Sequence, residues 1–402
     1  MNVLRMLALA AVLAAQSLAL AAGQTRFETI YTFTGAYPYG LTIANRVLYG
    51  LEATTGCGSI FALQPPPATG GAWTENTIYT FAGTPAGPDG CYPSWGPLPG
   101  PNGALYGLTS QGGVNGSGVL YELQPSAPGG AWSESVLYNF AGVTSGGGNL
   151  YPTFGLLPGP NGSFYGLGYL GATGGIAQLL PPVVAGAAWT GTLACTLPLA
   201  SGPTNSFTMD ASGAFFMTTA WGPSSAGALG QAFQLKLPAT PGAACTQTLL
   251  HNFSDGNKFA GNPNALMVAG DGTLYGSTYG YDLSGAAGTS VVYSLTPPAN
   301  PALTYTILKD FGMMGDHPDT PLLFRNGNLY GAMTTSKGGA VFEVQPPTTT
   351  GGAWTTTYLH SFTNGQMPVG TLVMDEGGTI YGVTQAAYGQ PVGGTIYRIA
   401  LP

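Results

Sequence analysis

Short segments in which apolar and polar residues alternate fill the chain from about residue 25 to its end, separated by turns rich in Gly, Pro, Asn and Ser. A period of two predicts half-buried β-strands, and closely spaced turns predict antiparallel neighbours. In one typical stretch we expect strands at residues 95–98, 104–109, 118–123 and 132–140. The pair Asn102-Gly103 favours the positive φ angles of a two-residue hairpin between the first two strands. This unit is therefore predicted to be a four-stranded antiparallel sheet.

The unit recurs along the chain, and each copy is marked by an aromatic residue and a glycine in its second strand. Successive marks are separated by 57, 59, 51, 59, 55 and 51 residues. A period near 55 indicates one supersecondary unit copied in tandem. The marks are Tyr49-Gly50, Tyr106-Gly107, Tyr165-Gly166, Phe216-Met217 (methionine replacing glycine), Tyr275-Gly276, Tyr330-Gly331 and Tyr381-Gly382. Equivalents of the hairpin pair are Asn161-Gly162, Ser212-Gly213, Asp271-Gly272, Asn326-Gly327 and Gly377-Gly378.

The two ends of the chain hold complementary parts of one unit. Residues 25–33 have the pattern of a fourth strand without the first three, and residues 394–400 have the pattern of a third strand without a fourth. An all-β, seven-bladed β-propeller whose last blade joins both ends explains this offset and leaves few sheet edges exposed. The alternative is an open solenoid, in which terminal units would have the character of caps.

The fourth strand of each unit has a constant length. Eight residues separate Trp73 from Phe81, and the same spacing separates Trp132 from Phe140. An even spacing places two residues on one face of a strand. We therefore expect both ends of this strand to pack against the same neighbouring blade.

These residues resemble a known family. The run Leu105-Tyr106-Gly107-Leu108-Thr109, followed by Gly118-Val119-Leu120-Tyr121, is similar to the GloVer-type tandem repeats of secreted bacterial proteins. The resemblance covers nearly all of residues 26–402. It implies secretion and a repeat scaffold, and it brings no established activity.

The first 21 residues have the pattern of a secretory signal peptide. Arg5 precedes a long apolar run, and Ala19-Leu20-Ala21 has the small residues of a cleavage site. An uncleaved anchor is the alternative, because the apolar region approaches the ~20 residues of a membrane span. No second apolar run of this length follows. We therefore expect a signal peptide at residues 1–21, a single domain at 22–402 without a membrane span, and a secreted protein, extracellular or periplasmic.

Charged residues are scarce, at 6% of the chain against about 25% in ordinary globular proteins. The 9 basic residues are scattered and outnumbered by 16 acidic ones. Binding to nucleic acid by counterion release needs clustered Lys and Arg, so this class of partner is excluded. The 44% of hydrophobic residues supply enough apolar surface to fold a chain with 65 glycines.

The two rims of the predicted propeller differ. The loop rim holds the connections between units and between second and third strands, such as those with Cys57 and Cys91; the hairpin rim holds the Asn-Gly hairpins and connections such as residues 64–72. Variable loops on a rigid frame usually carry binding, so we place the candidate site on the loop rim near the channel. The binding candidates are Asp89, Asp255, Asp282, Asp316, His317 and Asp319, with Trp95, Trp221, Tyr279 and Tyr281 as aromatic surfaces, and further Glu52, Lys258, Lys337, Tyr37, Tyr39 and Tyr169.

The densest cluster is Asp316-His317-Pro318-Asp319. Two carboxylates and an imidazole could hold a divalent cation or supply acid-base groups, but these residue types are also typical of a solvated turn. His251 and His360 fall in outer strands, away from the channel. Hydrolase, metalloprotease and phosphate-loop motifs are absent. The sequence thus predicts no catalytic residue and no cofactor, and it leaves a bound divalent cation open.

Four cysteines in an exported chain suggest two disulfides. Cys57 and Cys91 lie in adjacent connections on the loop rim, so we expect them to bond. Cys195 and Cys245 remain as the other pair. Cys245 starts one outer strand, whereas Cys195 lies six residues along its neighbour. This offset of about 20 Å exceeds disulfide reach unless the blade is irregular, so the second bond stays open.

Abundant aromatic residues with few charges favour a monomeric binding module whose loop rim contacts a glycan or another protein. The alternative is a glycoside hydrolase or polysaccharide lyase, and hydrolysis needs two carboxyl groups about 5 to 9.5 Å apart. A purely structural surface protein would have no pocket on its rim.

Overall fold

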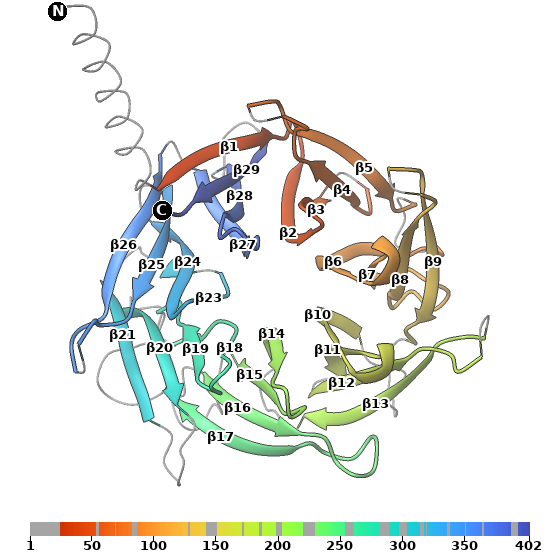
Figure 1. Cartoon of the computed structure of the whole chain (residues 1–402). Helices are drawn as coiled ribbons and strands as arrows, with labels where there is room; N and C mark the ends of the chain where they lie inside the picture. Colours follow the sequence, from red (N-terminus) through yellow and green to blue (C-terminus); the bar gives the residue numbers. More distant parts are fainter. Residues whose placement is uncertain are drawn as a thin grey trace, which may run out of the picture.

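The chain forms a ring of seven antiparallel sheets, which confirms the predicted all-β, seven-bladed propeller (Figure 1). The computed structural model describes residues 25–53, 56–68, 70–82, 87–127, 129–141, 151–170, 173–184, 187–197, 203–219, 230–253, 261–280, 289–296, 304–313, 317–318, 320–335, 338–349, 351–363, 366–386 and 393–402. The predicted signal peptide, residues 1–21, lies outside these ranges.

Each blade runs from an inner strand at the channel to an outer strand at the circumference (Figure 1). Blade 1 is β2 (Tyr37–Ala44), β3 (Val47–Ala53), β4 (Ser59–Gln64) and β5 (Thr74–Thr80), and blade 2 is β6 (Cys91–Pro99), β7 (Leu105–Gln111), β8 (Val119–Pro125) and β9 (Trp132–Asn139). Blade 3 is β10 (Tyr151–Pro158), β11 (Phe164–Leu170), β12 (Thr173–Leu180) and β13 (Thr190–Leu197), and blade 4 is β14 (Pro203–Met209), β15 (Phe215–Thr219), β16 (Gln231–Lys236) and β17 (Thr246–Asn252). Blade 5 is β18 (Met267–Val268), β19 (Leu274–Ser277), β20 (Thr289–Thr296) and β21 (Thr304–Met313). Blade 6 is β22 (His317–Pro318), β23 (Leu323–Arg325), β24 (Asn328–Thr335), β25 (Gly338–Gln345) and β26 (Thr355–Phe362), and blade 7 is β27 (Gln366–Met374), β28 (Ile380–Ala386), β29 (Gly394–Ala400) and β1 (Arg26–Thr32).

Blade 7 joins the two ends of the chain, as predicted. Strand β1 pairs antiparallel with β29, in a register from Arg26 opposite Ala400 to Thr32 opposite Thr395. Beside this ladder, Arg398 donates to the Glu28 carboxylate from Nε at 2.9 Å and from Nη2 at 2.6 Å. The pairing gives β29 a partner along its outer edge, so the ring closes without an exposed edge at this strand.

The glycine of the repeated mark is required by an aromatic ring on the next strand. Gly107 pairs with Tyr121, and a Cβ at Gly107 would overlap the phenol of Tyr121. The same overlap would occur at Gly50 with Phe61, Gly276 with Tyr293, Gly331 with Phe342 and Gly382 with Tyr397. At Gly166 the partner is Ala177, and the nearest atom to an added Cβ is Leu108 Cδ1 at 3.7 Å. The glycine of the motif therefore makes room for an aromatic ring of the neighbouring strand.

The hairpins on the hairpin rim are of two kinds. Asn102 and Gly103, within the 3-10 turn η1 (Pro101–Gly103), have φ of 57° and 78°, as the predicted two-residue hairpin requires. Asn161-Gly162, in η2 (Pro160–Gly162), and Asn326-Gly327 repeat it. At Asp210 the prediction is wrong: Gly213 N donates to Asp210 O, and only the glycine has a positive φ. The turns closed by Gly272 and Gly378 follow this second form, a four-residue turn with its left-handed residue last.

Every outer strand contains a β-bulge, which overturns the prediction that its two ends face the same way. In β9 the register skips Leu137 between Val136 and Tyr138. One extra residue reverses the alternation of faces. Trp132 therefore packs toward blade 1, edge-on to Tyr49 at 6.0 Å between ring centroids, whereas Phe140 packs toward blade 3. Each outer strand thus contacts both neighbouring blades.

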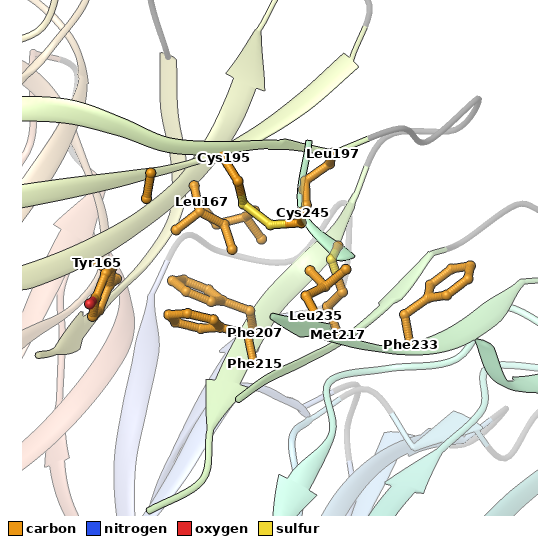
Figure 2. Packing of buried hydrophobic residues seen from close by; sticks show 12 residues of the cluster. Tyr165, Leu167, Cys195, Leu197, Phe207, Phe215, Met217, Phe233, Leu235 and Cys245 are labelled. Carbon is orange, nitrogen blue, oxygen red and sulfur yellow. A yellow bond between two sulfur atoms is a disulfide. The ribbon is translucent and has the colours of Figure 1, made fainter. Parts of the chain in front are cut away.

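Both disulfides are present. Cys57 bonds to Cys91 as expected, with 4.6 Å between Cα atoms. Cys195 bonds to Cys245, with 5.3 Å between Cα atoms, inside the apolar cluster joining blades 3 and 4 (Figure 2). The expected offset of the second pair does not apply, because the chain before β17 lies along β13: Thr196 N donates to Ala243 O at 3.1 Å, and Cys245 N donates to Thr196 O at 3.0 Å.

Candidate functional site

The structure describes part of the predicted loop-rim site. Asp89, Trp95, Tyr279 and His317 lie in described residues, as do Glu52, Tyr37 and Tyr39. Outside the described residues lie Asp255, Asp282, Asp316, Asp319, Trp221 and Tyr281, together with Lys258, Lys337 and the side chain of Tyr169. The hydrolase alternative, which needs two converging rim carboxylates, therefore stays a prediction.

Asp89 stabilises the connection between blades 1 and 2 by hydrogen bonds. Its Oδ2 accepts hydrogen bonds from Tyr79 Oη at 2.8 Å and from Ala82 N at 2.9 Å. Its Oδ1 is buried and has no hydrogen-bond partner among the described residues. These contacts hold the loop beside Cys91.

Glu134 in β9 is a titratable group that the sequence reasoning missed. Its Oε1 is also buried without a hydrogen-bond partner in the described residues. Burial, together with the charge of Asp89, raises the pKa of Glu134 from its ordinary 4.5 to about 7. Sequence spacing gave no sign of this effect, since Asp89 lies in the connection before β6 and Glu134 lies in the outer strand β9.

Glu134 is expected to make the protein less stable as the pH rises. With a folded-state pKa near 7 and an ordinary value of 4.5, the folded chain binds more protons between these values, so the free energy of unfolding falls across this window. Because the side chain is only about half buried, we expect a change of about 1 kcal/mol. Melting temperatures at pH 5 and pH 8 should differ less for Glu134→Gln than for the wild type. The exposed Glu376→Gln serves as control, and an unchanged difference in Glu134→Gln would contradict the assignment.

Two of the predicted rim residues, Tyr279 and His317, are in contact at the junction of blades 5 and 6. Their rings stack with 4.3 Å between centroids. His317 Nδ1 lies 2.7 Å from Tyr279 O and therefore carries the proton of this hydrogen bond. Ser290 Oγ donates to the same carbonyl at 2.9 Å. The contacts fix the imidazole against blade 5. Among described residues, no group of three or more His, Cys, Asp or Glu side chains could hold a metal ion.

His251 and His360 lie in the outer strands β17 and β26, as predicted. Each imidazole stacks on a ring of the following blade: His251 on Tyr305 at 4.0 Å between centroids, and His360 on Phe27 at 3.4 Å. Burial lowers the pKa of His360. These contacts make both histidines part of the packing between blades.

Strand β6 holds two aromatic residues in a left-handed backbone. Tyr92 and Trp95 have φ of 57° and 60°. Trp95 lies in the inner strand of blade 2, and Gly155 of blade 3 faces its indole. Tyr92, which the sequence reasoning missed, is 46% exposed directly after Cys91 on the loop rim. The sequence did not indicate Tyr92 as a site residue, because nothing in the residue pattern predicts its backbone angle.

The hairpin rim, where no site was predicted, carries a large groove between blades 1 and 2. Its volume is about 1140 Å³, and its lining residues bear no charge. The equivalent groove between blades 7 and 1 measures about 340 Å³ and includes Arg46, Arg398, Glu28 and Asp375. The two grooves therefore differ in both size and charge.

Ring closure by both termini and copies of one four-stranded unit define this protein as a tandem-repeat propeller. The family model of the Gloeobacter/Verrucomicrobia repeat matches residues 202–402, half of the chain, and the chain belongs to this family. The membership agrees with the resemblance of its motifs. A comparison with curated proteins found no match.

Solved structures with a similar fold are distant in sequence. A protein from Lactobacillus plantarum is 16% identical with a TM-score of 0.52, and the match covers 80% of this chain and 84% of that chain. The apo-form of the soluble aldose sugar dehydrogenase from Escherichia coli is 12% identical with a TM-score of 0.46, and the match covers 94% of this chain and 100% of that chain. The β-propeller domain of the trilobed protease from Pyrococcus furiosus is 9% identical with a TM-score of 0.47, and the match covers 88% of this chain and 93% of that chain. The first of these likenesses shows the fold alone. Within the described residues, no helix has the length and apolarity needed to cross a membrane.

Proposed function

We propose that the protein is a secreted, monomeric binding module that holds a glycan on its loop rim at blade 2. The observation that carries this proposal is the left-handed backbone of two aromatic residues, Tyr92 and Trp95, within four positions of β6. Such a conformation is strained for bulky side chains, by roughly 1–3 kcal/mol each, and strain of this kind clusters at functional sites.

Contacts around Tyr92 fix its backbone and leave its ring exposed to a ligand. The Cys57–Cys91 bond precedes it, its N–H donates to Cys57 O at 2.9 Å, and its carbonyl accepts from Ser110 Oγ at 3.2 Å. An exposed ring on a fixed backbone loses little conformational entropy when a flat partner stacks on it. The apolar faces of sugars are partners of this kind, and their uncharged hydroxyls suit a chain with 6% charged residues.

Two disulfides support the secreted location, because such bonds persist in oxidising compartments. The pattern of residues 1–21 supports it independently. We infer that the chain works outside the cytoplasm, where glycans of cell surfaces and matrices are the available partners.

Binding of the folded chain to a glycan array tests the proposal. We expect binding to at least one neutral glycan, and at least fivefold weaker binding by Tyr92→Asn, since asparagine tolerates the left-handed backbone. Tyr358→Thr is the control, because Tyr358 is 51% exposed on the outer strand β26. An array without any bound glycan, or equal binding by Tyr92→Asn, would overturn the proposal.

A further inference from the structure

The neutral groove on the hairpin rim is built from two adjacent blades. Blade 1 contributes the hairpin between β2 and β3 at Asn45 and a face of β3, β4 and β5. Blade 2 contributes Asn102-Gly103, the turn after Pro125, and Trp132. Its volume of about 1140 Å³ slightly exceeds the range of small-molecule sites, about 300–1,000 Å³. The lining combines two aromatic rings with side-chain amides and hydroxyls, namely Tyr49 and Trp132 with Asn45, Gln64, Thr74, Asn76, Thr77 and Asn102.

One position in the blade 1 wall of the groove lacks a long side chain. In the register of β3, β4 and β5, Ala62 lies between Tyr49 and Asn76. In every other blade the residue paired with the repeated aromatic is larger. These residues are Glu122, Gln178, Gln234, Ser294, Glu343 and Arg398.

The missing side chain also leaves a tyrosine hydroxyl available. Tyr106 Oη donates to Glu122 Oε1 at 2.7 Å, and Tyr330 Oη donates to Glu343 Oε1 at 2.9 Å. Tyr49 has no such partner at Ala62, and no described residue hydrogen-bonds its hydroxyl. Burial raises the pKa of Tyr49, so its phenol stays protonated and can donate to a ligand.

We propose that this groove is a second carbohydrate site, which takes a segment of a neutral polysaccharide. Rings of Tyr49 and Trp132, edge to face at 6.0 Å, offer apolar surface for a sugar face. Amides such as Asn76 offer donors and acceptors that match sugar hydroxyls. The absence of charge in the lining disfavours an acidic or basic polymer, whose charges would be desolvated without partners. The proposal shares the ligand class of the proposed function and uses a different site.

Filling the groove tests the proposal. Ala62→Glu and the uncharged Ala62→Gln copy the residues that other blades carry at this position, so both variants are expected to fold. Native gels containing hydroxyethyl cellulose, dextran or galactomannan serve as neutral probes, and polygalacturonate serves as the charged one. We expect at least one neutral polymer to retard the wild-type chain and both variants to bind it at least tenfold more weakly.

Two further variants separate this site from the loop rim. Gln178→Glu places a carboxylate at the same register in blade 3 and is expected to bind like the wild type. Tyr92→Asn is expected to keep the binding that Ala62→Glu loses. Equal retardation of the wild type and Ala62→Glu, or equal retardation by polygalacturonate, would overturn the groove while the loop-rim proposal stands. A wild type that no neutral polymer retards would overturn the groove, whereas the loop-rim proposal is decided by the glycan array.

Discussion

A chain that begins at residue 34, without β1, is expected to lose cooperative folding, whereas a chain that begins at residue 22 is expected to keep it. The deletion removes Ile30 and Phe33, which are 9% and 5% exposed, and Phe27, whose ring stacks on His360. Burial of each such side chain contributes about 1.5–3 kcal/mol, so their sum rivals the 5–15 kcal/mol that stabilises a whole domain. The deletion also leaves the outer edge of β29 unpaired.

Thermal unfolding by circular dichroism, with size-exclusion chromatography, measures this effect. The shorter chain should melt without a sharp transition and should form aggregates, because an unpaired edge strand invites pairing between molecules. Adding a synthetic peptide of residues 25–33 in excess should restore a sharp transition. Matching melting curves for the two chains would contradict the closure of the ring by β1.

Gly107→Ala is expected to destabilise the protein by about 1–3 kcal/mol, as overpacking of a filled core does. The new Cβ would meet the phenol of Tyr121, which is fully buried and cannot swing into solvent. Gly166→Ala is the matched control, because its nearest atom lies at 3.7 Å. This control should be neutral or slightly stabilising, since alanine loses less backbone entropy on folding.

Urea unfolding of the two variants and the wild type measures the difference in free energy. The double variant Gly107→Ala/Tyr121→Phe should recover part of the loss, because the hydroxyl nearest to the new methyl group is removed. Tyr121 Oη has no hydrogen-bond partner among the described residues, so its removal leaves no group unsatisfied. Equal stability of Gly107→Ala and Gly166→Ala would mean that the ring does not require the glycine.

The fold could be predicted because its signals repeat along the chain. Seven aromatic marks, six of them followed by glycine, predicted the number of blades, and the incomplete units at the two ends indicated how the ring closes. The direction in which the two ends of each outer strand face could not be predicted. The extra residue at positions such as Leu137 does not disturb the local alternation of residue types. The bond between Cys195 and Cys245 depended on a turn that runs along the preceding blade, and spacing alone cannot show such a contact.

The candidate sites were harder to predict than the fold. Tyr279 and His317 were expected on the same rim and do stack, because both lie at blade ends that the repeat locates. The groove beside Ala62 was missed, since its signal is a short side chain at a position that is recognised only after the strands are placed in register. Tyr92 was missed because a left-handed backbone at a tyrosine has no counterpart in the residue pattern.

The closing strand pair also sets an order of events during synthesis. Glu28 and Arg398, which share an ion pair across β1 and β29, are 370 residues apart. Strand β1 is therefore synthesised long before β29 and can pair with it only after the intervening polypeptide has followed. Blades 1 to 6 each consist of consecutive strands, whereas blade 7 needs both ends of the chain, so the ring can close only after β29 has been made.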